Sequence, residues 1–294
     1  MHFAIRYLSE YRYAGPVTDN LNSLRVRPAA TLWQHCDDFQ TRISPETKIS
    51  RHVDYFGTDV QEFAVVTPHE DLTIDVRARA ITRRPPPPPE GPWEGLRSRA
   101  YIDAAGEFGL PWKDQPPVAG LDGLQRAVLA ETPLQTLRAV CNEIPQRFEY
   151  RPGATYVGSE VADLLETGAG VCQDFAHLAL VLLRRYGIAA RYVSGYLWAA
   201  SDEGEARSME VETHGWLEAL LPSADPGGEP AWVSADPTNS VLADENHVKI
   251  GHGRFYWDVP PVRGIYRGTA ESELRASVTM SRVDVSSDDI PVAA

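Results

Sequence analysis

Five consecutive prolines, Pro85 to Pro89, divide this chain and limit what it can fold into. Proline fixes φ near about −65° and has no backbone N–H, so such a run continues neither a helix nor a sheet. It favours stiff polyproline II, which is typical of a linker or a surface strap. We prefer this interpretation to a recognition peptide. With Glu90-Gly91-Pro92 behind it, the run predicts a linker over residues 85–93.

The residues before this linker have the pattern of strands. Residues 72–80 (LTIDVRARA) alternate apolar and polar side chains, which is typical of a strand with one buried face. Residues 55–60 (YFGTDV) indicate a strand, a turn and a returning strand. Short strands joined by turns, with no convincing helix, predict an antiparallel β-sandwich domain over residues 1–84.

The residues after the linker mix helices and strands. Thr132-Pro133 is a helix start, and apolar residues follow it at helical spacing. Further helices are predicted over residues 159–167 and from Cys172 to Gly187. The predicted strands cover residues 190–198, 213–221 and 231–236. Helices followed by strands favour an α+β fold, with one domain over residues 94–294.

Charge and composition exclude some classes of partner. The 294 residues include 28 Lys and Arg and 41 Asp and Glu, a formal net charge of −13. Such a protein repels phosphate groups, so we expect it to bind neither nucleic acid nor a membrane. Arg6, Glu10 and Arg12 interrupt the N-terminus where a signal peptide needs an apolar run, and no stretch is long enough to span a bilayer. Three widely spaced cysteines suit a reducing cytoplasm.

Cys172 is the cysteine best placed for chemistry. It stands where the glycine-flanked turn 168–171 enters a helix, and the N–H groups of a first turn stabilise an anion. A thiolate there can act as a nucleophile, although a small side chain packed under the helix start would look the same. Cys141 lies on an apolar helical stripe and is predicted to be buried and inert, and nothing near Cys36 suggests activation.

A thiolate nucleophile needs a base, and His214 is the candidate. His177 is five residues beyond Cys172, so its side chain points about 140° away around the helix, and we expect it to pack or hydrogen-bond instead. His214 begins a predicted strand, where a histidine is also a common core residue. Asp236 ends a strand before Pro237 and could orient His214, or could simply form an Asp-Pro turn.

Four segments around these residues resemble the transglutaminase-like core: 170–177 (GVCQDFAH), 190–196 (ARYVSGY), 213–216 (THGW) and 236–239 (DPTN). The chain is most similar to bacterial transglutaminase-like proteins, which are provisionally described as cysteine proteases. Residues 1–84 are similar to the N-terminal region of those proteins, and 247–264 to their tail. The resemblance implies a papain-like α+β core with Cys172 as nucleophile, His214 as base and later acid, and Asp236 as the orienting group.

Several residues are candidates for the second hydrogen-bond donor to the oxyanion. The Cys172 backbone N–H is a natural first donor. Animal transglutaminases have a tryptophan upstream of the cysteine, but residues 148–170 contain none. Candidates for oxyanion or substrate contacts are Gln173, Tyr150, Tyr156 and Trp216.

The leading hypothesis is acyl transfer or hydrolysis of a peptide-like or side-chain amide through a thioester on Cys172. Water would release an acid and an amine acceptor would give transamidation, and we favour hydrolysis. Neither a cofactor nor a metal is implied. Two alternatives are a binding module that retained the fold and, with less support, a zinc site on the same residues, since no CxxC or HExxH spacing occurs. Acidic side chains before His214 are either solvated or favour a cationic substrate: Asp202, Glu203, Glu205, Glu210 and Glu212.

Overall fold

A computed structural model describes residues 1–110, 120–156, 158–198, 209–211 and 213–283, the side chains of 209–211 excepted. The first strands form a curved antiparallel sheet around one long strand, β1 (His2–Leu24). The first half of β1 pairs with β5 (His69–Thr82), and β5 pairs with β2 (Gln34–Ser44). The second half pairs with β4 (Asp59–Val65), which pairs with β3 (Ile49–Val53).

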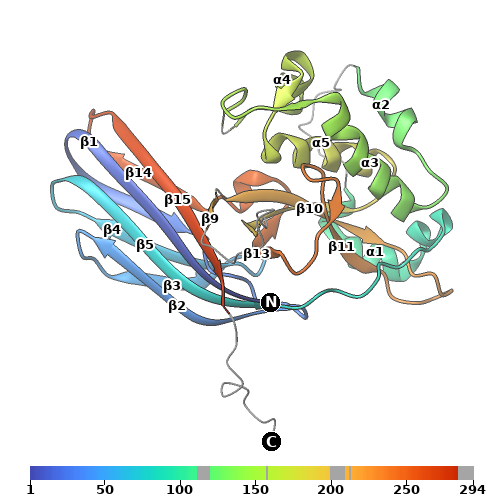
Figure 1. Cartoon of the computed structure of the whole chain (residues 1–294), viewed down its shortest axis with the longest axis horizontal. Helices are drawn as coiled ribbons and strands as arrows, with labels where there is room; N and C mark the ends of the chain where they lie inside the picture. The colour runs from blue at the N-terminus through green and yellow to red at the C-terminus, as the bar shows by residue number, and fades with distance from the viewer. Residues whose placement is uncertain (111–119, 157, 199–208, 212, 284–294) are drawn as a thin grey trace, which may run out of the picture.

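Two strands from the end of the chain complete this sheet. β14 (Val262–Arg267) pairs with the second half of β1, and β15 (Ser272–Arg282) pairs with the first half, opposite Phe3 to Tyr13. β9 (Met209–Val211) extends the sheet beyond β15. Figure 1 shows β14 and β15 lying alongside β1, although more than two hundred residues separate them in the sequence. The division at residues 85–93 remains a prediction, and strands from both sides of it share one sheet.

The predicted alternation in β5 is observed. Leu72, Ile74 and Val76 are buried, while the side chains between them face outward. Residues 83–92 form neither helix nor strand, as the prolines require. Gly91 in this segment passes so close to the Ser223 carbonyl that a Cβ there would lie 2.2 Å from the oxygen. The linker therefore runs tightly over the second part of the chain.

The second part is a five-stranded antiparallel sheet in the order β12–β11–β10–β8–β13. These strands are β8 (Ala190–Leu197), β10 (His214–Leu221), β11 (Ala231–Asp236), β12 (Val241–Leu242) and β13 (His247–Gly253). The helices are α1 (Arg99–Ala105), α2 (Leu121–Val128), α3 (Pro133–Arg147), α4 (Val161–Thr167) and α5 (Cys172–Arg185). Short 3₁₀ turns lie at Trp93–Arg97, Gly106–Gly109 and Tyr256–Asp258, and β6 (Glu149–Tyr150) pairs in parallel with β7 (Ala169–Gly170). The predicted α+β class is confirmed.

The buried helix α5 supports the site. Phe175, Leu178 and Leu182 are fully buried in a core shared with α3 and the sheet. α3 begins as predicted, because the Thr132 hydroxyl accepts the Gln135 N–H at 3.2 Å and Pro133 follows the cap. Burial of these apolar faces stabilises the helices more than their intrinsic propensity does.

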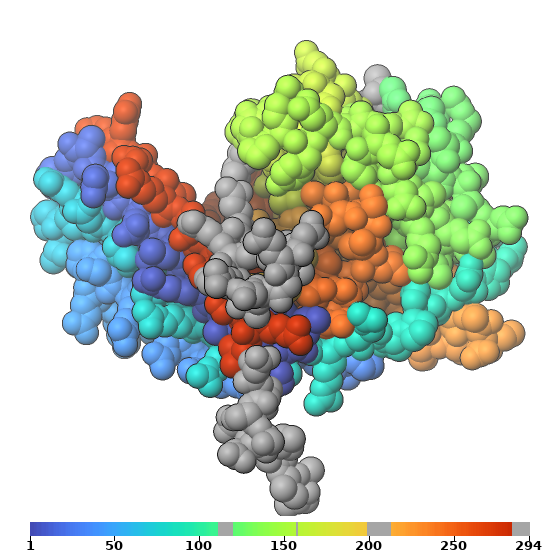
Figure 2. Space-filling model, in the orientation of Figure 1, coloured from blue at the N-terminus to red at the C-terminus, as the bar shows by residue number. Residues whose placement is uncertain are grey.

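The two sheets share apolar contacts. Tyr196 and Trp198, from β8 and the residue that follows it, lie in the core of the N-terminal sheet, and the Tyr196 hydroxyl donates to the Val26 carbonyl at 2.7 Å. In Figure 2 the outer ends of β1, β14 and β15 stand apart from the helical side, with a notch between them. Within the described ranges, no helix is long and apolar enough to cross a bilayer.

Candidate active site

Cys172 is the first residue of α5, as the sequence predicted. Asp174, in the first turn, accepts the Val171 N–H at 2.8 Å and the Thr155 hydroxyl at 2.6 Å. A Cβ on Gly170 would lie 2.8 Å from the Asp174 carboxylate, so the turn before Cys172 needs glycine there. These contacts fix the helix start, so Cys172 belongs to the first turn, whose N–H groups stabilise an anion.

The other two cysteines have no such setting. Cys141 is fully buried in α3, and burial raises the pKa of its thiol well above the usual value. Cys36 is also buried, and burial raises its pKa too. The predicted burial of Cys141 is confirmed, and the raised pKa values disfavour a thiolate at either residue. Cys172 is partly exposed.

His214 and Asp236 meet at the end of the sheet. β10 and β11 are antiparallel neighbours, so the start of one lies beside the end of the other. The His214 Nε2 atom lies 2.8 Å from Asp236 Oδ2, and the Asp236 side chain has no exposed surface. Because Nε2 faces Asp236, Nδ1 is the ring nitrogen left for Cys172.

The electrostatics favour a charged imidazole. Burial alone would lower the pKa of His214, but hydrogen bonds with Asp236 and with Cys172, and the negative charges of both, raise it to about 10. The structure thus joins His214 directly to Asp236, and the effect of Cys172 on the His214 pKa is that of a neighbouring group. An imidazolium next to a sulfur stabilises the thiolate form of that sulfur.

Asp236 also organises its own turn. Its Oδ1 accepts the backbone N–H groups of Thr238 at 2.9 Å and Asn239 at 3.3 Å, and Oδ2 accepts the Asn239 side-chain amide at 2.6 Å. Burial would raise the pKa of Asp236, but hydrogen bonds from His214, His247 and Asn239 hold it far below the usual range. The turn-forming and histidine-orienting interpretations of Asp236 therefore both fit the same carboxylate.

His247 is a second imidazole on this carboxylate, and the sequence pattern did not single it out. It begins β13, and its Nε2 lies 3.3 Å from Asp236 Oδ2. β13 pairs with β8, not with β10 or β11, so only the tertiary fold brings His247 to Asp236. No spacing in the sequence marks this contact.

Two tyrosines near Cys172 were also not predicted. Burial raises the pKa of Tyr192 and of Tyr256, and the negative charge of Cys172 adds to both effects. Their rings meet edge to face with centroids 6.1 Å apart. A Cβ on Gly215 would lie 2.1 Å from the Tyr192 hydroxyl oxygen, so glycine beside His214 makes room for this tyrosine.

His177 supports these two tyrosines and is not the base. Its Nε2 accepts the Tyr256 backbone N–H at 3.2 Å, and its ring packs on Tyr192 with centroids 5.2 Å apart. Burial lowers the pKa of His177 to about 4, so the ring is neutral at physiological pH. Its predicted hydrogen-bonding role is confirmed.

The remaining predicted contacts are spread around the site. Gln173 follows Cys172 on α5, and Tyr150 pairs with Gly170 just before it. Tyr156 is 73% exposed. All three remain predictions as oxyanion or substrate groups. Trp216 is 1% exposed and lies under His214 with ring centroids 6.0 Å apart, a position that disfavours direct contact with a substrate.

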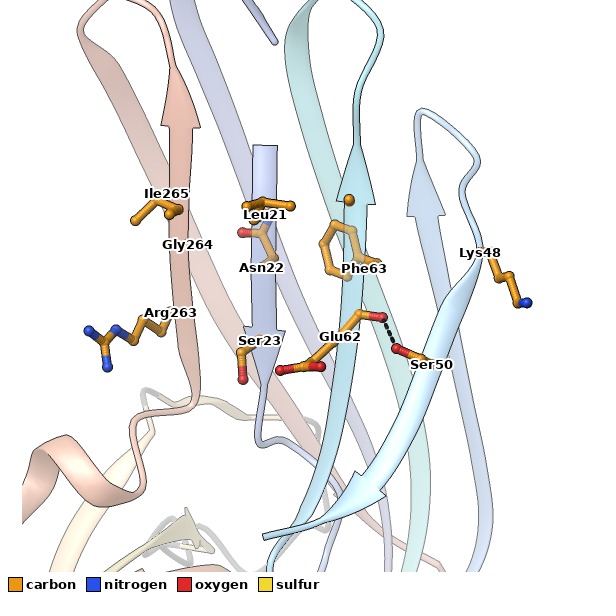
Figure 3. Close-up of a pocket in the computed structure, with 11 residues that line it drawn as sticks. Leu21, Asn22, Ser23, Lys48, Ser50, Glu62, Phe63, Arg263, Gly264 and Ile265 are labelled. Atoms are coloured by element: carbon orange, nitrogen blue, oxygen red, sulfur yellow. Dashed lines mark hydrogen bonds between the residues drawn. The ribbon is translucent and has the colours of Figure 1, made fainter. Parts of the chain in front are cut away.

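Three further features are the acidic side chains before His214, the zinc alternative and a depression on the surface. The acidic side chains at 202, 203, 205, 210 and 212 lie outside the described residues, so the idea of a cationic substrate stays a prediction. Across the described ranges, no group of three or more His, Cys, Asp or Glu side chains has the arrangement of a metal site. A depression of ≈ 720 Å³ lies on the N-terminal sheet between Leu21, Lys48 and Ile265 (Figure 3), and none of the predicted site residues lines it.

Comparison with known proteins shows the family of this chain. Residues 123–237 match the model of the transglutaminase-like superfamily, and residues 3–80 match that of the bacterial transglutaminase-like N-terminal region. An uncharacterised protein of Mycobacterium leprae is 34% identical over 275 residues, covering 93% of this chain and 96% of the relative. The chain belongs to the transglutaminase-like superfamily.

Two further relatives and one solved structure are also similar to this chain. An uncharacterised protein of Mycobacterium tuberculosis is 33% identical over 98% of this chain and 92% of its own length. A protein-glutamine gamma-glutamyltransferase of Pseudomonas aeruginosa is 29% identical over 43% of this chain and 19% of its own length. A crystal structure from Cytophaga hutchinsonii, provisionally named a cysteine protease, has a TM-score of 0.71 at 22% identity, covering 97% and 92% of the two chains. This last similarity shows that the two-part fold is shared.

Proposed function

We propose that the protein is a cysteine-dependent enzyme that cleaves or transfers a peptide-like or side-chain amide through a thioester on Cys172. The observation that carries this proposal is the contact of His214 Nε2 with the buried Asp236 carboxylate at 2.8 Å, and the rise in the pKa of His214 caused by Asp236 and Cys172 supports it. A buried imidazolium beside a partly exposed sulfur at a helix N-terminus is the arrangement that a thiolate nucleophile needs.

The first half of the reaction forms the acyl-enzyme. The Cys172 thiolate attacks the amide carbonyl carbon, and the negative charge moves to the carbonyl oxygen. The backbone N–H of Cys172 has no intrahelical acceptor, because it belongs to the first turn of α5, and it can donate to that oxygen. His214 then gives its proton to the leaving nitrogen as the C–N bond breaks, which leaves a thioester and a neutral imidazole.

The second half releases the acyl group. His214 takes a proton from the incoming water or amine, the nucleophile attacks the thioester, and the C–S bond breaks to restore the thiolate–imidazolium pair. The same residues serve both acceptors. The names of the relatives are divided, since one is a gamma-glutamyltransferase and the other is provisionally a protease. We favour water as the acceptor, and an amine is the second candidate.

Mass spectrometry of Cys172 tests the proposal. The protein is incubated with glutamine-containing peptides, with and without a labelled primary amine, and quenched in acid. We expect an acyl mass on the Cys172 peptide, together with free acid or amine-labelled product. Cys172→Ala should abolish both, while Cys36→Ala should retain them, because Cys36 lies in the other sheet. A folded wild-type protein that forms neither adduct nor product would favour the alternative of a binding module.

A further inference from the structure

His247 occupies a position that the proposed reaction has not used. Its side chain is 5% exposed, and its Nε2 shares Asp236 Oδ2 with His214 Nε2, at 3.3 Å and 2.8 Å. Trp216 lies against both rings, with centroids 5.4 Å from His247 and 6.0 Å from His214. Both imidazoles therefore contact one carboxylate oxygen, which also accepts the Asn239 amide, and the Asp236 side chain has no exposed surface.

The other ring nitrogen of His247 faces a second acid. Nδ1 lies 3.4 Å from Asp244 Oδ1 and 3.3 Å from the Asp244 backbone N–H. A neutral ring with its proton on Nε2 can accept that N–H while donating to Asp236. A charged ring can donate to both carboxylates, so both protonation states have partners here. The pKa of Asp244 is lowered to about 2, and its hydrogen bond with His247 is the largest cause. This carboxylate therefore stays charged.

Charges act on His247 from three elements. Burial lowers its pKa, but hydrogen bonds with Asp236 on β11 and Asp244 in the preceding turn, and the charge of Asp236, produce a net rise above 6.5. The charge of His214 on β10 opposes that rise. Two groups that interact through one carboxylate titrate as a coupled pair.

We infer that His247 is a positioning residue of the site: it holds Asp236 against His214 and adds its own ionisation to the pH dependence of the reaction. This inference rests on the proposed function. When His247 is charged, its positive charge offsets the negative charge of Asp236. Asp236 then stabilises the His214 proton less, so His214 is the stronger acid toward the leaving nitrogen. When His247 is neutral, His214 keeps its proton more firmly.

Histidine ring titrations by ¹⁵N NMR test the coupling without any substrate. Spectra are recorded from about pH 5 to about pH 11, a range that brackets ordinary and raised histidine values. We expect His247 to titrate above 6.5, and His214→Gln to move its pKa further up, because the opposing charge is lost. Asp236→Asn should move it down. His252→Gln is the matched control on β13, since burial lowers the pKa of His252 to about 3 and its ring nitrogen contacts Arg191 at 3.1 Å.

The pH profile of kcat/KM separates positioning from structure. We expect His247→Gln, which can still donate to Asp236, to remove one ionisation between the outer limbs while His252→Gln retains it. The inference would be overturned if the pKa of His247 were the same in the wild type, His214→Gln and Asp236→Asn. It would also be overturned if His247→Gln lowered kcat/KM by the same factor at every pH. Failure of the proposed function has a different signature: a His214 titration that Cys172→Ala does not change.

Discussion

At the scale of residues, one carboxylate connects the whole site. Asp236 accepts hydrogen bonds from two histidines, one amide and two backbone N–H groups. Residue type and strand ends made Cys172, His214 and Asp236 candidates, and the resemblance to the transglutaminase-like core combined them into one site, which stays a prediction. His247 and Tyr256 could not be predicted in this way, because each reaches the site through tertiary packing alone.

Replacing Asp236 with Asn should disable the site with little change of shape. The amide cannot stabilise a charged imidazole, so the pKa of His214 should fall from about 10 toward its ordinary value of 6.5. We expect kcat/KM to fall by about 10²–10⁴-fold. Steady-state kinetics with the substrate found by adduct mapping provide the measurement, and activity within about twofold of the wild type would be inconsistent with this role.

The raised pKa of His214 also predicts a dependence of stability on pH. The folded protein holds a proton that the unfolded chain releases above about 6.5, so the free energy of unfolding contributed by His214 is full below that pH and is lost as the pH rises to about 10. Urea denaturation of the wild type and of His214→Gln at several pH values gives the difference. That difference should shrink across the window, and a constant or growing difference would contradict the assignment.

At the scale of elements, the start of α5 combines stability with chemistry. The ends of α5, β8, β10 and β11 were predicted to within one or two residues, because apolar periodicity and glycine stops mark them. α1 was not predicted, because its seven residues show too short a pattern.

Removing the Asp174 cap should loosen the helix start. Asp174→Ala loses the Val171 and Thr155 contacts, and we expect the free energy of unfolding to fall by about 1–2 kcal/mol and Cys172 alkylation to slow. Asp163→Ala is the matched control, because Asp163 caps α4 through the Glu160 N–H at 2.7 Å. Both variants should lose stability, but only the first should change the alkylation rate. Equal rates in the two would show that the cap does not position the thiol.

Gly215 should accept a side chain only when Tyr192 is shortened. Gly215→Ala brings a methyl group onto the Tyr192 hydroxyl and should cost about 1–3 kcal/mol. Tyr192→Phe removes that oxygen, so the cost of Gly215→Ala should be smaller in its background. A double-mutant cycle from urea denaturation measures the coupling, and additive effects would exclude this contact as the reason for glycine.

At the scale of the whole molecule, the last strands of the chain pair with the first one. β15 and β14 pair with nearly the full length of β1, so the N-terminal sheet contains strands from both ends of the sequence. Local patterns cannot show such pairing, because the partners are more than two hundred residues apart. Local patterns therefore predict one domain over residues 94–294, although β14 and β15 belong to the N-terminal sheet.

An isolated segment of residues 1–84 should therefore not behave as a stable domain. Without β14 and β15, β1 exposes unpaired N–H and C=O groups along both halves, and open edges promote aggregation. Circular dichroism and analytical ultracentrifugation should find an aggregated or unfolded species. A folded monomer with a cooperative transition would instead support the predicted boundary at residues 85–93.

Alkylation of Cys172 by iodoacetamide at about pH 6 most directly tests the thiolate–imidazolium pair. Free cysteine is almost wholly protonated at that pH, so it reacts slowly. We predict that Cys172 reacts at least ~10-fold faster than free cysteine, and that His214→Gln removes the advantage. A wild-type Cys172 that reacts no faster than free cysteine would contradict the account.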